Sequence, residues 1–414
     1  MAKRLDSESS NLLLFISGRF ESLLGWAALM VAMPLFVLDK TGSGTMMGVF
    51  SLVGALPRFV ILPFAGVIGD RMNRKHLMVF LDFVKGSLLL LSFLLSFYGR
   101  LTVTGLLIFY VFFGIISALF DAPTSAMLAD LVSSDKLRKA VSLNTAATSL
   151  AQIAGPAIGG LLYGFSDMTY VLLFTGIFYI FSAISEIFIR YSFSKRTTVE
   201  GVFKEIANGI RFIVSNRGLK SLFIFAAVAN FISAPAFSVV IPYILRKELN
   251  FSAQWFGTLE MLFMVGALLG SLLTATVLAT TNSKRLITVG ITLESLIGCL
   301  MALLLMQFNM QRNFTLAFSS TSLLLMGIFN MLVNVPIGAN LQALIPSQVR
   351  SRVLSILTIF SSGLTPIGSL LGGVIVDRIN AFGFFLVLNL LMLVVSLLFV
   401  FLAPREAFLQ SQAK

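Results

Sequence analysis

The residues of this chain that could do chemistry are ionisable side chains placed inside long apolar segments. They are Arg19, Glu21, Arg58, Asp82, Lys85, Asp121, Glu260 and Glu294, while Glu186 lies toward one end of its segment. A charge at membrane depth costs about 2.5–3.5 kcal/mol on insertion scales, so each of these residues marks a candidate functional site. A buried carboxylate can carry a proton, and a nearby cation changes how readily it does so.

Depth and spacing separate these candidates. Glu21 lies about 15 Å into its segment, near the midplane of a bilayer, and is the leading candidate for a proton or substrate site. The alternative is a permanent salt bridge between Glu21 and an arginine. Arg19 lies two residues away and faces another direction, so we expect it to pair with a different helix, and Arg58 is the other arginine that could meet Glu21. Asp82 and Lys85 are three residues apart, which favours a structural ion pair on one helix face.

Further polar residues could line a binding cavity. Glu260 and Glu294 each lie well inside an apolar segment, and the amides Asn230, Asn330 and Asn334 stand among many phenylalanines and methionines. Such a mixture suits a large amphipathic ligand that is held by few fixed contacts. The plainer interpretation is that the amides bridge helices and the aromatic side chains face lipid. The sequence leaves both interpretations open.

The elements that position these residues are membrane helices. The chain is 57% hydrophobic and 12% charged, with a mean hydropathy of +0.95, whereas soluble domains carry about 25% charged residues. Because about 20 apolar residues cross a bilayer core, the sequence predicts an all-α membrane protein with twelve transmembrane helices. The predicted segments are 11–38, 45–69, 76–98, 102–127, 141–163, 169–190, 219–246, 253–279, 286–306, 314–343, 353–376 and 382–403.

Composition also excludes several classes of function. The net charge of +12 comes from short turns between the segments rather than from one basic face, so we expect no nucleic-acid partner. A single histidine and a single cysteine cannot build a metal site or a disulfide framework, and we expect no cofactor. The same scarcity leaves a membrane-embedded enzyme little catalytic equipment. No Gly-x-x-x-x-Gly-Lys-Ser/Thr loop for a nucleotide is present.

Charge distribution predicts the topology and the domain boundaries. Lysine and arginine number 21 on the side of the predicted termini and six on the other side, which places both termini in the cytoplasm. Residues 191–218 form the longest polar stretch and include a predicted amphipathic surface helix over 199–215. This cytoplasmic linker separates two predicted six-helix bundles, 1–190 and 219–414.

The two halves of the sequence repeat. A shift of 213 residues lays Gly155 on Gly368, and Gly159-Gly160 on Gly372-Gly373. Each match is weak alone, but they share an offset close to half the chain length. Repeated six-helix halves predict two bundles related by an axis along the membrane normal, with a cavity between them.

Two motifs carry a resemblance to a known family. Residues 66–75 read Gly-Val-Ile-Gly-Asp-Arg-Met-Asn-Arg-Lys, and residues 155–160 read Gly-Pro-Ala-Ile-Gly-Gly. The first resembles the Gly-x-x-x-Asp-Arg-x-Gly-Arg-Lys signature of the major facilitator superfamily, and the second resembles that superfamily's exporter signature. Asn73 replaces the usual glycine, and because asparagine tolerates positive φ, the tight turn is expected to survive. The helix-packing residues are Gly155, Pro156, Gly159 and Gly160.

The resemblance covers essentially the whole chain and implies a gate at the turn over 66–75. In the family, the signature aspartate holds the positive N-terminal end of helix 11, which begins near Val353 here, so Asp70 is assigned this latch. Arg71 and Arg74 are expected to pair with Asp121, Asp130 or Asp135. The alternative is a charge cluster that sets topology without gating. The residues of the predicted gate are Gly66, Asp70, Arg71, Arg74, Lys75 and Asp121.

A narrower likeness points to export. Residues 39–43 (Asp-Lys-Thr-Gly-Ser) and 121–123 (Asp-Ala-Pro) resemble bacterial macrolide-efflux and related drug or siderophore exporters. We therefore expect a transporter that exports hydrophobic or amphipathic small molecules by alternating access and is driven by proton antiport. We expect it to be a monomer that lies in a bacterial cytoplasmic membrane, in contact with membrane lipids. Residues 102–120 lack the arginine that the resembled antiporters place there, so Arg19 or Arg58 substitutes for it or coupling differs. The alternatives are a lipid or lysolipid flippase or a solute importer, and more distantly an enzyme or a sensor.

Overall fold

The structure is a computed structural model that describes residues 2–133, 135–191, 202–307, 311–346 and 350–408. The side chains of Arg58, Asp70 and Arg71 and the packing of Gly66 lie outside the described residues. The chain divides into two compact units. The first unit comprises Met1–Lys40, Val53–Val199 and Ser252–Met261, and the second comprises Thr41–Leu52, Glu200–Phe251 and Leu262–Lys414.

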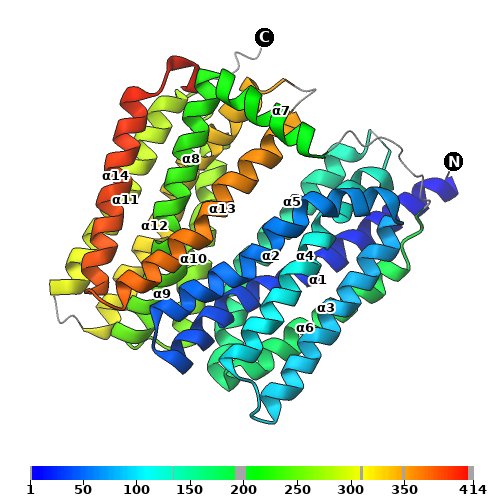
Figure 1. Cartoon of the computed structure of the whole chain (residues 1–414), viewed down its shortest axis with the longest axis horizontal. Helices are drawn as coiled ribbons and strands as arrows, with labels where there is room; N and C mark the ends of the chain where they lie inside the picture. The colour runs from blue at the N-terminus through cyan, green and yellow to red at the C-terminus, as the bar shows by residue number, and fades with distance from the viewer. Residues whose placement is uncertain (1, 134, 192–201, 308–310, 347–349, 409–414) are drawn as a thin grey trace. The chain divides into compact units, whose positions relative to one another are not determined.

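The first unit is built around helices α1, α3, α4 and α6. Its elements are α1 (Ala2–Thr41), the part of α2 (Gly44–Arg71) after Leu52, α3 (Arg74–Phe97), α4 (Val103–Leu131), α5 (Leu137–Ser166) and α6 (Met168–Ile187). Helix α3 lies along both α6 and α4 (Figure 1). Buried apolar side chains, among them Phe15, Leu81 and Phe120, join α1, α3 and α4 in one core.

The second unit contains the remaining helices. They are α7 (Val202–Ser215), α8 (Arg217–Pro235), η1 (Ala236–Val240), α9 (Ile241–Tyr243), η2 (Ile244–Glu248), α10 (Ala253–Ala275), of which the part from Leu262 on belongs here, α11 (Ser283–Gln307), α12 (Arg312–Leu344), α13 (Arg350–Val376), α14 (Ala381–Leu402) and η3 (Arg405–Phe408). Helix α11 packs on α12 and α14, and α13 packs on α8 (Figure 1). Phe225, Ile291, Val333 and Phe399 belong to the core of this unit.

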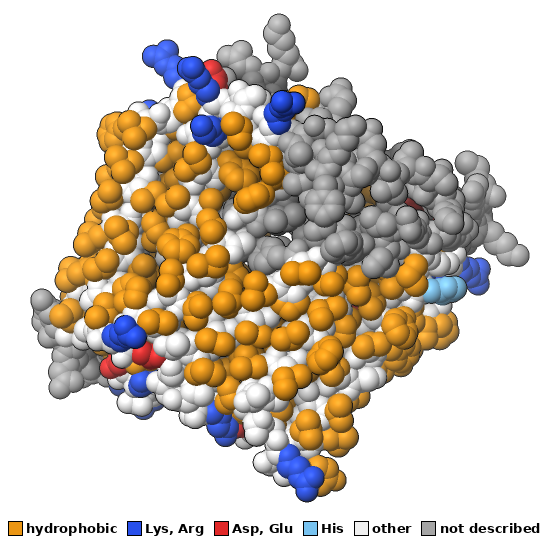
Figure 2. All heavy atoms as spheres, in the orientation of Figure 1, with side chains coloured by type: hydrophobic (Ala, Val, Ile, Leu, Met, Phe, Trp, Pro, Cys, Tyr) orange, Lys and Arg blue, Asp and Glu red, His pale blue; other side chains and the backbone are white. Residues whose placement is uncertain are grey.

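The predicted all-α membrane fold is confirmed, and each of the twelve predicted segments corresponds to a helix or a continuous helical run. Within the described part of the chain, nine helices are long and apolar enough to cross a membrane. Hydrophobic side chains cover the visible face of the described helices, while lysine and arginine gather at their ends (Figure 2). Such a surface is stable where lipid surrounds it.

The seventh predicted segment is one continuous helical run from α8 to η2 that changes its hydrogen-bonding pattern. Pro235 lacks an N–H, so it cannot donate to the carbonyl oxygen of Phe231 as a helical residue would. The chain continues through the π-helical turns η1 and η2, which re-route the backbone hydrogen bonds. Gly368 of α13 packs closely against the carbonyl oxygen of Phe231. A Cβ at position 368 would clash with that oxygen, so the contact requires glycine.

Asn73 has a different role from the one predicted. Its φ is −65°, so the turn does not use the positive φ that we expected. Instead the Asn73 side chain accepts hydrogen bonds from the backbone N–H groups of Lys75 and His76 and caps α3. Asparagine is one of the preferred N-cap residues, so the replacement of glycine gives this turn a helix start.

The predicted amphipathic helix of the linker is present as α7, which packs against α13 and α8. Ile213 is buried in the core of the second unit. A Cβ at Gly209 would clash with Ile356. The apolar face of α7 is therefore covered at least in part by protein. The division of the chain into bundles at 191–218 stays a prediction.

Candidate functional site

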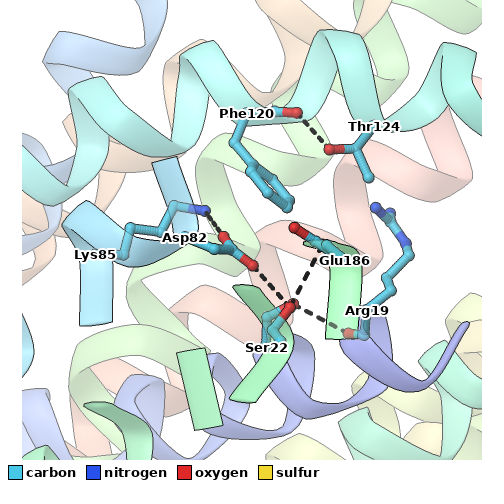
Figure 3. A network of polar contacts seen from close by, with 8 residues as sticks. Arg19, Ser22, Asp82, Lys85, Phe120, Thr124 and Glu186 are labelled. Carbon is cyan, nitrogen blue, oxygen red and sulfur yellow. Dashed lines mark hydrogen bonds and ion pairs between the residues drawn. The ribbon is translucent and has the colours of Figure 1, made fainter. Parts of the chain in front are cut away.

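A buried ion pair on α3 forms the centre of a polar cluster in the first unit. Lys85 Nζ lies 3.3 Å from Asp82 Oδ1, and the two side chains are 3% and 0% exposed. Ser182 of α6 donates a hydrogen bond of 2.8 Å to Asp82 Oδ2. Both oxygens of Asp82 are thus engaged, one by a cation and one by a hydroxyl (Figure 3).

Aromatic rings complete the surroundings of Lys85. Its ammonium lies 3.6 Å from the centre of the Phe120 ring and 5.1 Å from that of Tyr179. A desolvated cation over an aromatic face is attracted by the ring quadrupole, by about 2 kcal/mol. Lys85 is therefore held by the Asp82 carboxylate and the Phe120 ring of α4, both seen in Figure 3, and by the Tyr179 ring of α6.

Arg19 and Glu186 extend this cluster toward α1 and α6. Ser182 lies 3.5 Å from Glu186 Oε1, and Arg19 interacts electrostatically with Asp121, Asp82 and Glu186. Within the described residues, Nε of Arg19 and Oε2 of Glu186 are buried without a hydrogen-bond partner. The first-unit cluster, by which we mean Arg19, Asp82, Lys85, Asp121, Ser182 and Glu186, therefore holds three carboxylates and two cations.

Glu21 stands apart from this cluster. It is half-buried on α1, and its Oε2 is buried without a hydrogen-bond partner among the described residues. Arg19 interacts with carboxylates of α3, α4 and α6 rather than with Glu21, which agrees with the different faces that their spacing predicts. The role of Glu21 stays a prediction.

The second unit contains a carboxylate with a different environment. Glu294 lies near the middle of α11, about 17 Å from its start. Its Oε1 accepts a hydrogen bond of 3.0 Å from Asn330 Nδ2, and Asn330 Oδ1 accepts one of 2.8 Å from Asn334 Nδ2. Asn334 is exposed. The three side chains form a polar line from α11 to the surface of α12.

Glu294 also borders a cavity inside the second unit. The space open to water centres measures about 20 Å³, which is enough for one water molecule. Helices α8, η1, α11, α12 and α14 contribute its walls. Its polar lining residues are Ser233, Glu294, Ser295 and Asn389.

The remaining candidates, Glu260 and Asn230, make fewer polar contacts. Glu260 is half-buried on α10 and has no hydrogen bond or ion pair among the described residues. Asn230 is exposed and donates 2.8 Å to Ala226 O within its own helix. These two residues do not join the polar groups described above.

The signature turn is anchored within the first unit. Arg74 NH1 lies 2.6 Å from Asp130 Oδ2, which also accepts 2.9 Å from the hydroxyl of Tyr191. Lys75 Nζ donates 2.6 Å to the carbonyl oxygen of Ile187. Of the three carboxylates expected to pair with the arginines, the structure brings Asp130 to Arg74.

The glycines of the exporter-like signature lie at close helix contacts. A Cβ at Gly155 or Gly159 would clash with Ala27 or Ala28 of α1, and one at Gly160 would clash with the first turn of α10. Their counterparts in the repeat behave alike. Cβ atoms at Gly368 and Gly372 would clash with Phe231 and Pro235 of α8, and one at Gly373 would clash with the first turn of α2.

One site was missed by sequence reasoning. Asp377, just after α13, accepts hydrogen bonds of 2.7 Å from Ser43 Oγ, 2.7 Å from Gly44 N and 2.8 Å from Thr45 N. We call this contact the Asp377 junction. Partial burial opposes ionisation, but the hydrogen bonds from Ser43, Thr45 and Gly44 outweigh it and hold the pKa of Asp377 below its ordinary value.

A sequence signal for this site existed. Residues 373–378 read Gly-Val-Ile-Val-Asp-Arg, and residues 66–71 read Gly-Val-Ile-Gly-Asp-Arg. The aspartate at the end of α13 therefore repeats the signature aspartate at the end of α2. Asp377 meets the N-terminus of α2, while Asp70 was predicted to meet the N-terminus of α13.

Comparison with known proteins identifies the class. The profile of the family described as transmembrane secretion effector matches residues 13–412. The chain belongs to this family, within the major facilitator superfamily, and is a membrane transporter rather than an enzyme.

Relatives and solved structures agree with this class. The chain is 24% identical to macrolide efflux protein A of Streptococcus pyogenes over 92% of its own length and 93% of that protein. It is 25% identical to the multidrug efflux pump Tap of Mycolicibacterium fortuitum, over 95% and 96% of the two chains. The nucleoside transporter NupG, at 12% identity, aligns with 96% of this chain and 98% of its own, with a TM-score of 0.74. A bacterial homologue of ferroportin, at 17% identity, aligns over 96% and 99% with a TM-score of 0.71.

Proposed function

We propose that this transporter exports hydrophobic or amphipathic small molecules, macrolides and other drugs among them, across the bacterial cytoplasmic membrane in exchange for protons. Full-length likeness to two efflux proteins supports the direction and the substrate class. The first-unit cluster supports proton exchange, because its carboxylate Glu186 is buried and Oε2 of Glu186 has no hydrogen-bond partner among the described residues. A buried carboxylate oxygen without a partner is costly to keep charged, which favours the uptake of a proton.

Glu186 is the carboxylate that we assign to this proton. Asp82 already has Lys85 and Ser182 on its two oxygens, whereas Oε2 of Glu186 is buried without a partner among the described residues. Arg19 interacts with all three carboxylates of the cluster. It can therefore pair with Glu186 when Glu186 has lost its proton and with the other carboxylates when Glu186 is protonated. Arg19 would then do the work that the missing arginine of residues 102–120 does in the resembled antiporters.

Export from proteoliposomes under an imposed pH gradient tests this proposal. The wild-type protein is expected to move a macrolide or an amphipathic dye against its concentration gradient and to stop when a protonophore is added. Glu186→Gln should abolish gradient-driven movement but keep passive exchange of the substrate. The exposed Glu248 provides the control, since Glu248→Gln should behave as wild type. Export that ignores the protonophore would overturn proton antiport.

We also propose that two aspartates act as alternating latches. The Asp377 junction joins residues 43–45 to the end of α13, and the proposed latch is that this contact breaks and re-forms during alternating access. The repeated motif at residues 66–71 gives Asp70 the reciprocal contact with the N-terminus of α13. A carboxylate at a helix N-terminus is stabilised by the helix dipole and by the free N–H groups there.

The two latches predict opposite effects. Asp377→Asn should raise the accessibility of the cavity from the side opposite the termini, and Asp70→Asn should raise it from the terminal side. Cysteine accessibility measured in both variants from each side of the membrane reports this difference. Equal changes in both variants would contradict alternation. We place both termini in the cytoplasm from the charge distribution, and reporter fusions at the termini test that placement.

A further inference from the structure

The carboxylate of Glu294, beside the cavity of the second unit, differs from those of the first-unit cluster because no cation accompanies it among the described residues. The apolar spans of the second half contain no lysine, arginine or histidine at all over 221–245, 286–311, 313–349 and 379–404. Glu294 interacts instead with the neutral amide of Asn330 at 3.0 Å. A carboxylate at membrane depth without a counter-charge is costly to keep ionised.

The charged groups on the elements packed around Glu294 all lie at helix ends. Helix α14 has none, and Cys299 is the other titratable side chain in the middle of α11. The charges on the other elements are Arg217 and Lys220 of α8, Arg246, Lys247 and Glu248 of η2, Lys284 and Arg285 of α11, and Arg312 of α12. A proton is therefore the ion that would neutralise Glu294 without a cation from the protein.

We propose that Glu294 is a proton-binding site of the second unit, with a water molecule in the adjoining cavity as its proton donor and acceptor. Asn330 occupies Oε1, so Oε2 is the oxygen that takes the proton. The cavity is large enough for one water and presents Ser233, Ser295 and Asn389 as further polar partners, which meets the usual requirement for a buried water.

Asn330 and Asn334 have a separate task in this site. An amide does not readily pass a proton on, so the two asparagines do not conduct protons. Asn330 orients the carboxylate of Glu294 by its hydrogen bond to Oε1. The hydrogen bond between Asn330 and Asn334 then connects this group to the exposed surface of α12. A substrate or a solvent molecule that contacts Asn334 would thereby act on Glu294 through two hydrogen bonds.

This inference rests on the proposed proton antiport and adds a second proton site, in the other unit, to the cluster around Glu186. Infrared difference spectra of the reconstituted protein between acidic and alkaline pH test it directly. We expect a protonated-carboxyl band that Glu294→Gln removes. Glu260→Gln is the matched control, because Glu260 is also a half-buried carboxylate but has neither the amide partner nor the cavity.

Transport provides the second readout. Glu294→Gln should lower gradient-driven export about tenfold, within the range usual for coupling between two sites, while substrate binding stays within twofold or so. Glu294→Asp keeps a carboxyl group and should restore part of the coupling, which separates a proton role from misfolding. If wild-type export ignores the pH gradient, the proposed function fails as a whole. If wild-type export is proton-driven and Glu294→Gln keeps both the band and its coupling, only this inference fails. Sodium-driven export that Glu294→Gln abolishes would overturn the assignment to a proton.

Discussion

The two units place a carboxylate at the same point of the repeat and surround it differently. A shift of 212 residues, which also lays Gly54-Ala55-Leu56 on Gly266-Ala267-Leu268, lays Asp82 on Glu294. Asp82 is fully buried between Lys85 at 3.3 Å and Ser182 at 2.8 Å, whereas Glu294 has one amide and a water-sized cavity. Asp82 therefore has a buried cation as its partner, whereas Glu294 has none among the described residues. Equivalent positions in a repeat thus support opposite roles.

The largest effect is expected where the first unit loses a cation. Lys85→Met would leave Asp82 buried without its counter-charge, and breaking a buried ion pair in this way costs about 3–5 kcal/mol. The melting temperature of the purified protein in detergent measures the loss. The double variant Asp82→Asn, Lys85→Met removes both charges and should recover much of the stability. A double variant no more stable than Lys85→Met would show that the pair does not act as a unit.

Neutralising the two equivalent carboxylates should separate the units. Asp82→Asn leaves Lys85 buried beside an amide and should cost about 3 kcal/mol. Glu294→Gln leaves no unpaired cation and can still accept from Asn330, so its stability should change by about 0.5 kcal/mol or less. Thermal unfolding of the two variants side by side measures the gap. Equal losses would remove the distinction between a structural and a titrating carboxylate.

The glycine contacts test where the units are alike. Gly159→Ala and Gly372→Ala would each drive a Cβ into a neighbouring helix, at a cost of about 1–3 kcal/mol. Gly338 on α12 has no atom near its Cβ position, so Gly338→Ala should be neutral or should stabilise its helix by up to about 1 kcal/mol. The sign of the change in melting temperature decides between the two kinds of site. A stabilising Gly372→Ala would mean that the repeat does not preserve the contact.

A small effect is also expected at the Asp377 junction. Asp377→Asn removes a charge that interacts with the N-terminus of α2, worth about 0.3–1 kcal/mol. Because the pKa of Asp377 lies below its ordinary value of 3.8, its contribution is complete above that value and is lost only as the pH falls through the lowered pKa. The stability difference between wild type and variant should therefore stay constant between about pH 5 and pH 8. A difference that changes over this range would place another titrating group at the junction.

The fold followed from the sequence because its causes are local. Apolar runs of membrane length specify the helices, and polar turns end them, so the predicted segment 353–376 and the observed α13 differ by three residues at one end. Asn73 shows the limit of such reasoning. Its residue type allowed both a positive φ and an N-cap, and only the direction of its side chain distinguishes them.

The candidate site was predictable only in part. The pair Asp82–Lys85 followed from helical spacing, and the separation of Arg19 from Glu21 followed from their different faces. The partnership of Ser182 with Asp82 joins residues 100 positions apart, and no local pattern marks that serine. The cavity beside Glu294 is a gap that remains where five helical elements pack together, and the sequence does not reveal how closely they pack.

The position of Lys85 beneath the Phe120 ring has a consequence for chemical labelling. An amine that is 3% exposed and faces an aromatic ring at 3.6 Å cannot be reached by a water-soluble acylating reagent. Acylation of Lys85 therefore requires the first unit to open, and the rate of acylation measures how often the unit opens. A substrate that holds the unit closed will lower the acylation rate of Lys85. The acylation rate of Lys85 therefore reports conformational exchange in the first unit.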